Sequence, residues 1–283
     1  MSACPSRAAA PVHRPSDVGR LAAECLKLEA ATYPKPGLVS HVDNGAHRDM
    51  DFALLTLSAE ILEPYFDDLA EAGAAGAEMH RLRAIGVAAE RAMLRATGGV
   101  NTHRGAIFGL GLLVAAAGFR SAYGCSDALG KVIAARWGDA ILAGPRALHS
   151  HGAEVARRHG VGGARLEAAR GLPSVYSIAL PSLQLGRRLA EGDEEAARVQ
   201  ACLALIARID DTNLLHRGGG AGLAFAQAQA TVFLASGGVG QKDWRARAEA
   251  LHTAFVARNL SPGGCADLLA MALFIDKLEG VRC

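Results

Sequence analysis

RGAIFGLGLLVAAAGF, residues 104–119, is the stretch that decides the fold. It is apolar over most of its length and carries small residues on its faces, namely Gly105, Gly109, Gly111, Ala115, Ala116 and Ala117. Small faces let helix axes approach closely, which favours a compact bundle of many helices. The apolar run 107–117 is too short and too rich in glycine for the roughly 20 uninterrupted residues of a membrane span. We therefore expect no such span.

Helical periodicity continues on both sides of this stretch. Apolar residues recur at helical spacing over residues 21–31, behind the predicted cap Ser16-Asp17, and over 52–62, behind Asp49. Further helices are predicted over residues 76–96, 104–120, 126–137, 139–158, 174–190, 193–209, 221–236, 243–257 and 264–279. β-branched and polar residues never alternate over the length of a strand, so the sequence predicts an all-α fold.

No fixed-period repeat or linker divides the chain. We therefore predict a compact single-domain multi-helix bundle over residues 16–283, with a polar, loop-lined pocket. Residues 1–15 contain three prolines and no apolar run long enough for a signal peptide, and are predicted to form a flexible N-terminal arm.

Charge and cysteine content restrict the class of protein. The 283 residues hold 30 basic and 28 acidic side chains, a formal charge of +2, which is too balanced for a nucleic-acid-binding surface. Six cysteines are scattered without a CxxC pair, which indicates a reduced, cytoplasmic protein without a zinc site. A local cluster of arginine and lysine can still bind a small anion.

The first polar segment is YPKPGLVS, residues 33–40. Pro34 and Pro36 stiffen the chain around Lys35, so its ammonium group can meet a phosphate at little ordering cost. A solvated lysine on a turn that ends a helix is the alternative.

The chain continues as SHVDNGAHRDMD, residues 40–51, with two histidines and three carboxylates. This density indicates acid–base or metal chemistry. Asp43 and His47 share a face if the segment is helical, although Asn44-Gly45 favours a turn. Asp49 is either a carboxylate directed at Mg²⁺ or the N-cap of the next helix.

The segment GGVNTHRG, residues 98–105, joins two predicted helices. Asn101 or Thr102 can cap the second helix, and the N–H groups at its start would lie beside His103 and Arg104. This combination predicts an anion-binding cradle. The GxxxxGK[ST] spacing of a P-loop is absent, and a plain helix junction is the alternative.

The third polar segment, DDTNLLHRGGG, follows an apolar helix at residues 210–220. The adjacent carboxylates Asp210 and Asp211 repel each other unless a cation lies between them, which suggests Mg²⁺. Asn213 adds an amide, and Arg217 adds a guanidinium fork for phosphate. A solvated loop between helices is the alternative.

Two weaker segments complete the set. In NLSPGGCAD, residues 259–267, Ser261 is the predicted N-cap and Pro262 the first helical residue, which leaves the N–H groups of Gly263 and Gly264 for a phosphate oxygen. Ordinary capping explains most of this pattern. In GARLEAARG, residues 163–171, the functional candidates are Arg165 and Glu167, and an exposed helix with balanced charges is the alternative.

Taken together and in this order, PKPGLVS, HRDM, GVNTHRGAIFGLG, GARLEAARG, DDTNLLHRGG and NLSPGGCADLLA resemble the triphosphoribosyl-dephospho-CoA synthase family. The resemblance covers the chain from about residue 29 onward and points to the branch that serves malonate decarboxylase. It implies an all-helical transferase that joins ATP to 3′-dephospho-CoA and releases adenine. Arg104 and Cys265 differ from the lysine and serine that are common in members serving citrate lyase.

The implied reaction is a glycosyl transfer with charge development at the anomeric carbon of ATP. The resemblance then suggests roles for the polar residues. Phosphate would be bound by Lys35, Arg104 and Arg217, Mg²⁺ by Asp210 and Asp211, and protons would be moved by Asp43 or His47 with His103. Further substrate contacts would come from Asn101, Arg165, Glu167, Asn213, Gly263 and Gly264.

The resemblance also implies partners for the product: a phosphoribosyl-dephospho-CoA transferase and an acyl-carrier subunit, with a homodimer left open. Three other functions remain to be weighed. The same reaction could serve citrate lyase, and a non-catalytic helical docking module for an acyl carrier is the alternative outside enzymes. A helical prenyl-transferase-like enzyme is disfavoured because the chain lacks two DDxxD motifs.

Overall fold

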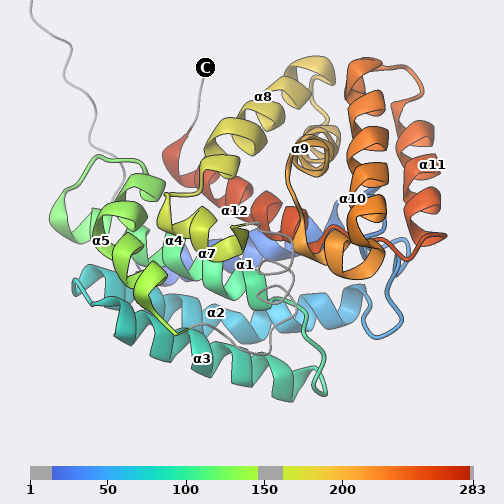
Figure 1. Cartoon of the computed structure of the whole chain (residues 1–283). Coiled ribbons are helices and arrows are strands. Elements are labelled where there is room, and N and C mark those ends of the chain that lie inside the picture. The colour runs from blue at the N-terminus through green and yellow to red at the C-terminus, as the bar shows by residue number, and fades with distance from the viewer. Residues whose placement is uncertain (1–14, 146–161, 281–283) are drawn as a thin grey trace, which may run out of the picture.

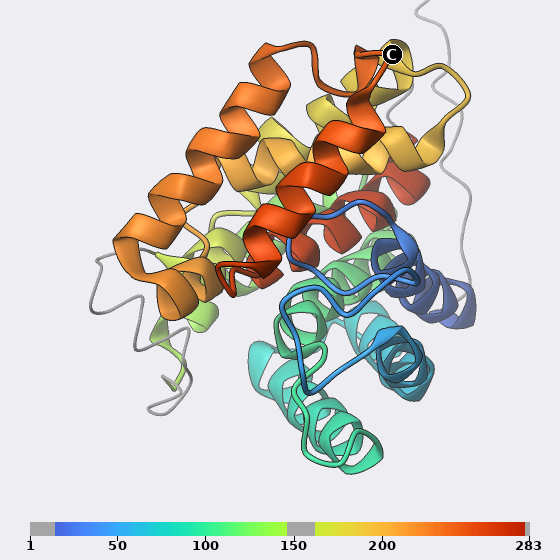
Figure 2. The same cartoon turned by 90° about the vertical axis from the view of Figure 1, so that its right-hand side faces the viewer.

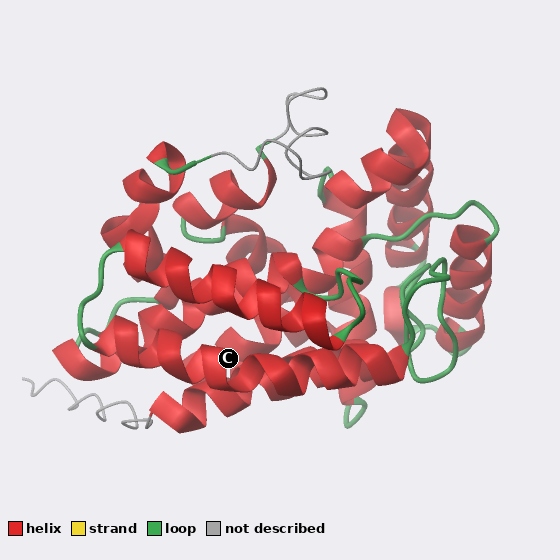
Figure 3. Cartoon of the chain, turned by 90° about the horizontal axis from the view of Figure 1, so that it is seen from below, coloured by secondary structure: helices red, strands yellow, loops and turns green. Residues whose placement is uncertain are grey.

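The computed structural model describes residues 15–145 and 162–280 (Figure 1). The predicted N-terminal arm and most of the predicted helix 139–158 lie outside these ranges. Within them the chain is helical and contains no strand, which confirms the predicted all-α class (Figure 3).

The first helices are α1 (Pro15–Ala31), α2 (Phe52–Ala74), α3 (Met79–Ala96), α4 (Arg104–Tyr123) and α5 (Leu129–Ala143). After residue 161 follow α7 (Gly163–Ala169), the π-helical turn η1 (Val175–Ala179), α8 (Leu180–Leu189) and α9 (Glu194–Arg208). The chain then forms α10 (Thr212–Ala235), the 3₁₀ turn η2 (Gly238–Gly240), α11 (Trp244–Val256) and α12 (Gly263–Glu279).

Helix α4 lies at the centre of the bundle and packs against α1, α2, α3, α5 and α12. In Figure 1, α2 and α3 lie below α1 and α4, while α8, α9, α10 and α11 form the upper right part. Figure 2 shows α10 and α11 side by side, with the loop that follows α1 next to α11. One continuous cluster of buried apolar side chains runs from Val18 to Leu278.

Small residues set the distance between α2 and α4, as the sequence predicted. A Cβ atom on Gly118 of α4 would lie 2.0 Å from the carbonyl oxygen of Ala70, and one on Gly73 of α2 would lie 1.9 Å from that of Ala115. The two backbones are therefore closer than any larger side chain permits. By length and composition α4 is apolar enough to cross a membrane, but 67% of its most apolar window is buried inside the bundle, as in a core helix.

The prediction of two helices on either side of Gly138 is wrong. Residues 129–143 form the single helix α5, in which Gly138 is buried. A Cβ atom there would lie 2.9 Å from the carbonyl oxygen of Ala169, the last residue of α7. This glycine therefore permits close packing and does not end the helix.

The predicted loop over residues 210–220 is also wrong, because α10 already begins at Thr212. Asp211 caps this helix, and its carboxylate accepts hydrogen bonds from the N–H groups of Asn213 and Leu214. The glycines produce a kink: Gly219 has φ 60° and ψ −163° inside the helix, a conformation that other residues rarely adopt.

Three predicted helix starts need correction. The carboxylate that caps α2 belongs to Asp51, which accepts from the N–H of Leu54 at 2.8 Å, and not to Asp49. Helix α1 begins at Pro15, before the predicted cap. Helix α12 begins after Pro262, and the hydroxyl of Ser261 makes no capping bond. Asn101 does accept from the first N–H of α4 at 3.1 Å, as predicted.

The cysteines of the described chain are free, and Cys25, Cys202 and Cys265 are buried. Burial raises the pKa of the Cys25 and Cys202 thiols to about 12. These side chains therefore pack as small apolar groups.

Candidate functional site

A cavity of about 1100 Å³ lies where the loop after α1, α7, the junction of α9 and α10, and the first turns of α4 and α12 meet. Lys35, His103 and Arg217 all reach it, although they are far apart in the sequence. Their meeting at one pocket is what the sequence predicted. Most other candidate residues also line the cavity: His47, Asn101, Arg104, Arg165, Glu167, Asp210, Asp211, Asn213, Gly263 and Gly264.

Asp43 is the candidate that does not line the cavity. Its carboxylate accepts from the N–H of Gly45 at 2.8 Å and contacts Nε2 of His252 at 3.0 Å. The other ring nitrogen of His252 lies 2.8 Å from the carbonyl oxygen of Lys35. Asp43 thus braces the loop after α1 against α11, and its position gives no support to a catalytic role.

Three helices point their N-terminal ends at the cavity. Arg104 and Gly105 of α4, Thr212 and Asn213 of α10, and Gly263 and Gly264 of α12 all belong to the lining. The partial positive charge of a helix N-terminus favours anions, although the first N–H of α4 is paired with Asn101 and those of Asn213, Leu214 and Cys265 are paired with Asp211. The convergence of three such ends on one cavity suits a ligand with several negative charges.

Asp211 joins two of these helix ends. Its Oδ1 accepts from the N–H groups of Asn213 and Leu214 at 2.7 and 3.1 Å, and its Oδ2 accepts from the N–H of Cys265 at 2.8 Å. The residue is 2% exposed. Burial raises the pKa of this carboxyl, and the three N–H donors act in the opposite direction. Its oxygens are therefore committed to the backbone, which leaves little capacity for a metal ion.

Asp210, by contrast, is exposed, and its carboxylate accepts a hydrogen bond from the side-chain amide of Gln227 at 3.2 Å. Among residues 15–145 and 162–280 there is no group of three or more His, Cys, Asp or Glu side chains placed to hold a metal ion. A Mg²⁺ ion at the cavity would therefore take one carboxylate, that of Asp210, from the described residues and its remaining oxygens from phosphate and water.

Lys35 is the most deeply buried charged residue at the site, with 1% of its surface exposed. Its ammonium group donates to the carbonyl oxygen of Glu29 at 2.6 Å and forms an ion pair with the Glu29 carboxylate. Two of its three N–H donors are thus used inside the fold. The predicted free phosphate-binding lysine is instead half of a buried ion pair at the cavity wall.

His103, directly before α4, is 5% exposed and its Nδ1 lies 2.8 Å from the hydroxyl of Ser58 on α2. Burial, and secondarily the positive charge of Lys35, lower the pKa of His103 to about 4. The ring is therefore neutral at physiological pH. Its Nε2 is buried and has no hydrogen-bond partner in the described chain.

His47 has contacts at both ring nitrogens. Nε2 lies 2.8 Å from the hydroxyl of Ser261, and Nδ1 lies 3.2 Å from the guanidinium of Arg217. Burial lowers the pKa of His47, and the charge of Arg217 adds to this effect. Arg217 also donates to the carbonyl oxygen of Ala46 at 2.8 Å and to the side chain of Asn259 at 3.1 Å. It therefore ties the loop after α1 to the turn before α12.

Two further candidates are engaged within the fold. The guanidinium of Arg165 donates to carbonyl oxygens at the end of α5, including those of Leu142 at 2.9 Å and Gly144 at 3.0 Å. Glu167 accepts from the N–H and hydroxyl of Ser174 at 2.7 and 3.0 Å. Both side chains hold α7 in place at the edge of the cavity.

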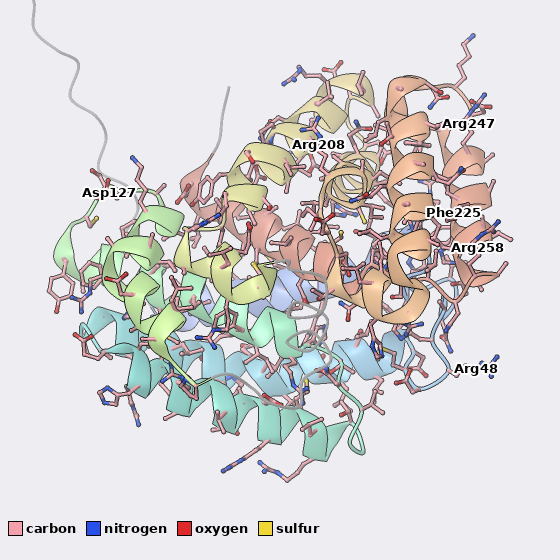
Figure 4. The ribbon with its side chains drawn as sticks, viewed as in Figure 1. Arg48, Asp127, Arg208, Phe225, Arg247 and Arg258 are labelled. Carbon is pink, nitrogen blue, oxygen red and sulfur yellow. The ribbon has the colours of Figure 1, made fainter. Side chains whose placement is uncertain are left out.

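The cavity arginines whose side chains form no hydrogen bond or ion pair in the described chain are not the ones that were predicted. Arg104 is paired with Glu90, its Nε lying 2.7 Å from the carboxylate. The side chains of Arg170 and Arg208 are exposed, line the cavity, and form no hydrogen bond or ion pair within the described chain. Figure 4 labels Arg208 at the end of α9. The only sequence signal for these two was a basic residue at a helix end, which is common.

Asp267, near the start of α12, is a third residue that sequence reasoning missed. It lines the cavity, and its carboxylate lies so close to α4 that a Cβ atom on Gly105 would be 2.0 Å from it. Burial raises the pKa of Asp267 well above its usual range, and the nearby charges of Glu29 and Asp211 add to this effect. Both effects favour the protonated form of this carboxyl group.

Comparison with known proteins identifies relatives over almost the whole chain. The family model of ATP:dephospho-CoA triphosphoribosyl transferases matches residues 15–282. A protein of Pseudomonas paraeruginosa named probable 2-(5″-triphosphoribosyl)-3′-dephosphocoenzyme-A synthase is 44% identical over 265 residues, which cover 91% of this chain and 89% of the relative. A Pectobacterium atrosepticum protein named 2-(5″-triphosphoribosyl)-3′-dephosphocoenzyme-A synthase is 42% identical, with 90% and 87% covered. No solved structure matches the chain.

Proposed function

The chain belongs to the family of ATP:dephospho-CoA triphosphoribosyl transferases, and from this premise we propose that it makes 2′-(5″-triphosphoribosyl)-3′-dephospho-CoA from ATP and 3′-dephospho-CoA. The 2′-hydroxyl of dephospho-CoA attacks C1′ of the ATP ribose, and the bond from C1′ to adenine breaks. The observation that carries the proposal is the convergence of three helix N-termini on one cavity, because this arrangement suits a triphosphate.

The triphosphate would lie against the first turns of α4, α10 and α12. The guanidinium groups of Arg170 and Arg208 are free to bind its oxygens, since no side chain of the described structure neutralises them. Arg104 is already in an ion pair with Glu90, so its positive charge is only partly available to the triphosphate. Asn101, Asn213 and the N–H groups of Gly263 and Gly264 add neutral donors at the same ends.

Mg²⁺, when bound, would neutralise charge on the phosphate oxygens and so favour binding of the nucleotide. Asp210 is the residue that would hold it, because its carboxylate is exposed at the cavity. Asp211 would act through the fold, by holding α10 and α12 at a fixed separation.

Two residues are placed to assist the transfer. Adenine must gain a proton as it departs, and the attacking hydroxyl must lose one, so the transfer as a whole takes up and releases no proton. Asp267 lines the cavity, and burial raises its pKa well above the usual range, so it is our candidate acid. His103, neutral and without a partner at Nε2, is our candidate for a hydrogen bond to the nucleotide.

We further propose that the product serves malonate decarboxylase in the cytoplasm, through a phosphoribosyl-dephospho-CoA transferase that modifies an acyl-carrier subunit. Arg104 and Cys265 support this choice over citrate lyase, because both differ from the residues common in citrate-lyase members. Supplying the product and that transferase with each apo acyl-carrier subunit in turn tests the choice. Modification of the citrate lyase subunit alone would reverse it.

Incubating the purified protein with Mg²⁺, ATP and dephospho-CoA, and then separating the products, tests the reaction. We expect free adenine in equal amount with the coupled product. Formation of ADP or AMP without adenine would mean that phosphorus is attacked and that the proposal is wrong. Absence of any nucleotide product would favour a non-catalytic docking module.

Replacing Arg208 with alanine should raise the KM for ATP by about tenfold, because a charge-assisted hydrogen bond contributes about 1.5–3 kcal/mol. Arg247→Ala is the matched control. Arg247 is exposed on α11, pairs with Asp243 at 2.9 Å, and lies away from the cavity (Figure 4). Steady-state kinetics with varied ATP measure the effect. Equal KM values for the two variants would remove Arg208 from the phosphate site.

A further inference from the structure

A chain of three side chains connects α2 to the start of α4 at the cavity wall. Thr102 donates its hydroxyl hydrogen to the hydroxyl oxygen of Ser58 at 2.7 Å. The same oxygen of Ser58 lies 2.8 Å from Nδ1 of His103. Ser58 is 0% exposed and His103 is 5% exposed, so the contact between these two side chains is shielded from water.

The hydrogen-bonding capacity of Ser58 fixes the direction of the chain. A hydroxyl has one hydrogen to donate, and leaving it unpaired in a buried place is costly. The hydroxyl of Thr102 already donates to one lone pair of the Ser58 oxygen. Within the described chain, the only other hydrogen-bond partner of the Ser58 hydroxyl is Nδ1 of His103. The hydrogen of Ser58 is therefore best placed on the line to Nδ1, which must then accept it.

An accepting Nδ1 requires that the neutral imidazole carry its own hydrogen on Nε2. That nitrogen is buried and has no partner in the described chain, while its residue lines the cavity. Among the charged groups near the ring, Lys35 disfavours a second proton. The ring thus keeps one N–H donor in reserve for a ligand.

We propose that Ser58 and Thr102 are positioning residues that hold His103 as the Nε2–H tautomer, so that a neutral N–H donor is ready for an acceptor atom of the bound nucleotide. The identity of this ligand rests on the proposed function. The tautomer does not, since it is a property of the protein without substrate. A purely structural tie between α2 and α4 would place no requirement on which nitrogen carries the hydrogen.

The tautomer is measured directly on protein labelled with ¹⁵N-histidine, without substrates. Two-bond ¹H–¹⁵N correlation spectra distinguish a protonated from an unprotonated ring nitrogen, and the His103→Gln variant identifies the signal of His103. We expect an unprotonated, hydrogen-bonded Nδ1 and a protonated Nε2. A hydrogen on Nδ1 of the wild-type protein would overturn the proposal.

Variants connect the tautomer to turnover. In Ser58→Ala and Thr102→Val we expect His103 to populate both tautomers. We expect each variant to lower kcat by about tenfold, which is less than the usual effect of removing a positioned proton-transfer group. The KM for ATP should change little. Thr102→Ser keeps the hydroxyl and should restore both properties. Unchanged kcat in Thr102→Val would overturn the proposal even if Ser58→Ala fails to fold.

Thr56→Val is the matched control, because Thr56 lies on the same helix and bonds only to the carbonyl oxygen of Phe52 in its own turn. It should leave both the spectrum and kcat unchanged. If the wild-type protein forms no adenine, the proposed function fails while the spectra still decide the tautomer. If adenine forms but the hydrogen lies on Nδ1, only the present inference fails.

Discussion

Replacing Lys35 with methionine should lower the free energy of unfolding by about 3–5 kcal/mol, the usual cost of removing one partner from a buried ion pair. The variant leaves the carboxylate of Glu29 in a place that is only 6% exposed, without its counter-charge. Urea-induced unfolding, followed by circular dichroism, measures the change. A loss below about 1 kcal/mol, as for an exposed pair, would contradict the buried pair.

The double variant Glu29→Gln/Lys35→Met separates stability from function. It removes both charges and should recover most of the lost stability, because no unpaired charge remains. If it is also active, Lys35 serves the fold alone. If it is stable and inactive, the charge of Lys35 at the cavity wall is needed by the reaction, as the sequence first suggested.

Asp211→Ala should lower the free energy of unfolding by about 3 kcal/mol. The variant loses a helix cap and leaves a buried N–H group without a hydrogen-bond acceptor. The N–H groups affected belong to Asn213, Leu214 and Cys265. Thermal and urea unfolding measure the effect.

Asp210→Ala is the control next to it in sequence. Asp210 is exposed, so this variant should change stability by less than about 0.5 kcal/mol. It should instead lower turnover and raise the Mg²⁺ concentration needed for half-maximal rate. The opposite pattern, with Asp211→Ala stable and altered in its Mg²⁺ titration, would return Asp211 to the metal site.

The fold was largely predictable because apolar residues follow helical periodicity and helices pack through small faces. Apart from the three misplaced helix starts, the errors came from glycine. Gly138 and the three glycines at 218–220 look like helix ends in a sequence. In the structure, Gly138 lies inside α5, and α10 continues across residues 218–220 with a kink. A glycine that breaks a helix and one that permits close packing give the same signal, and only the neighbouring helix distinguishes them.

The site was predictable in place but less so in the role of each residue. A carboxylate that caps a helix and one that binds a metal occur in the same sequence context, so Asp211 could not be told from Asp210. The guanidinium of Arg165 donates to backbone carbonyl oxygens of Leu142 and Gly144, and no local sequence pattern predicts these contacts. Ser58 has no motif at all, since its importance comes from a contact with His103 across 45 positions.

The kink at Gly219 divides α10 into two parts with different neighbours. The inner part follows the cap Asp211 and includes Arg217, which lines the cavity, while Phe225 in the outer part packs against Phe255 of α11. We expect the two parts to be under separate selection. We expect substitutions in the outer part to accompany substitutions in the surface that it covers. Substitutions in the inner part should be limited by their effect on substrate binding.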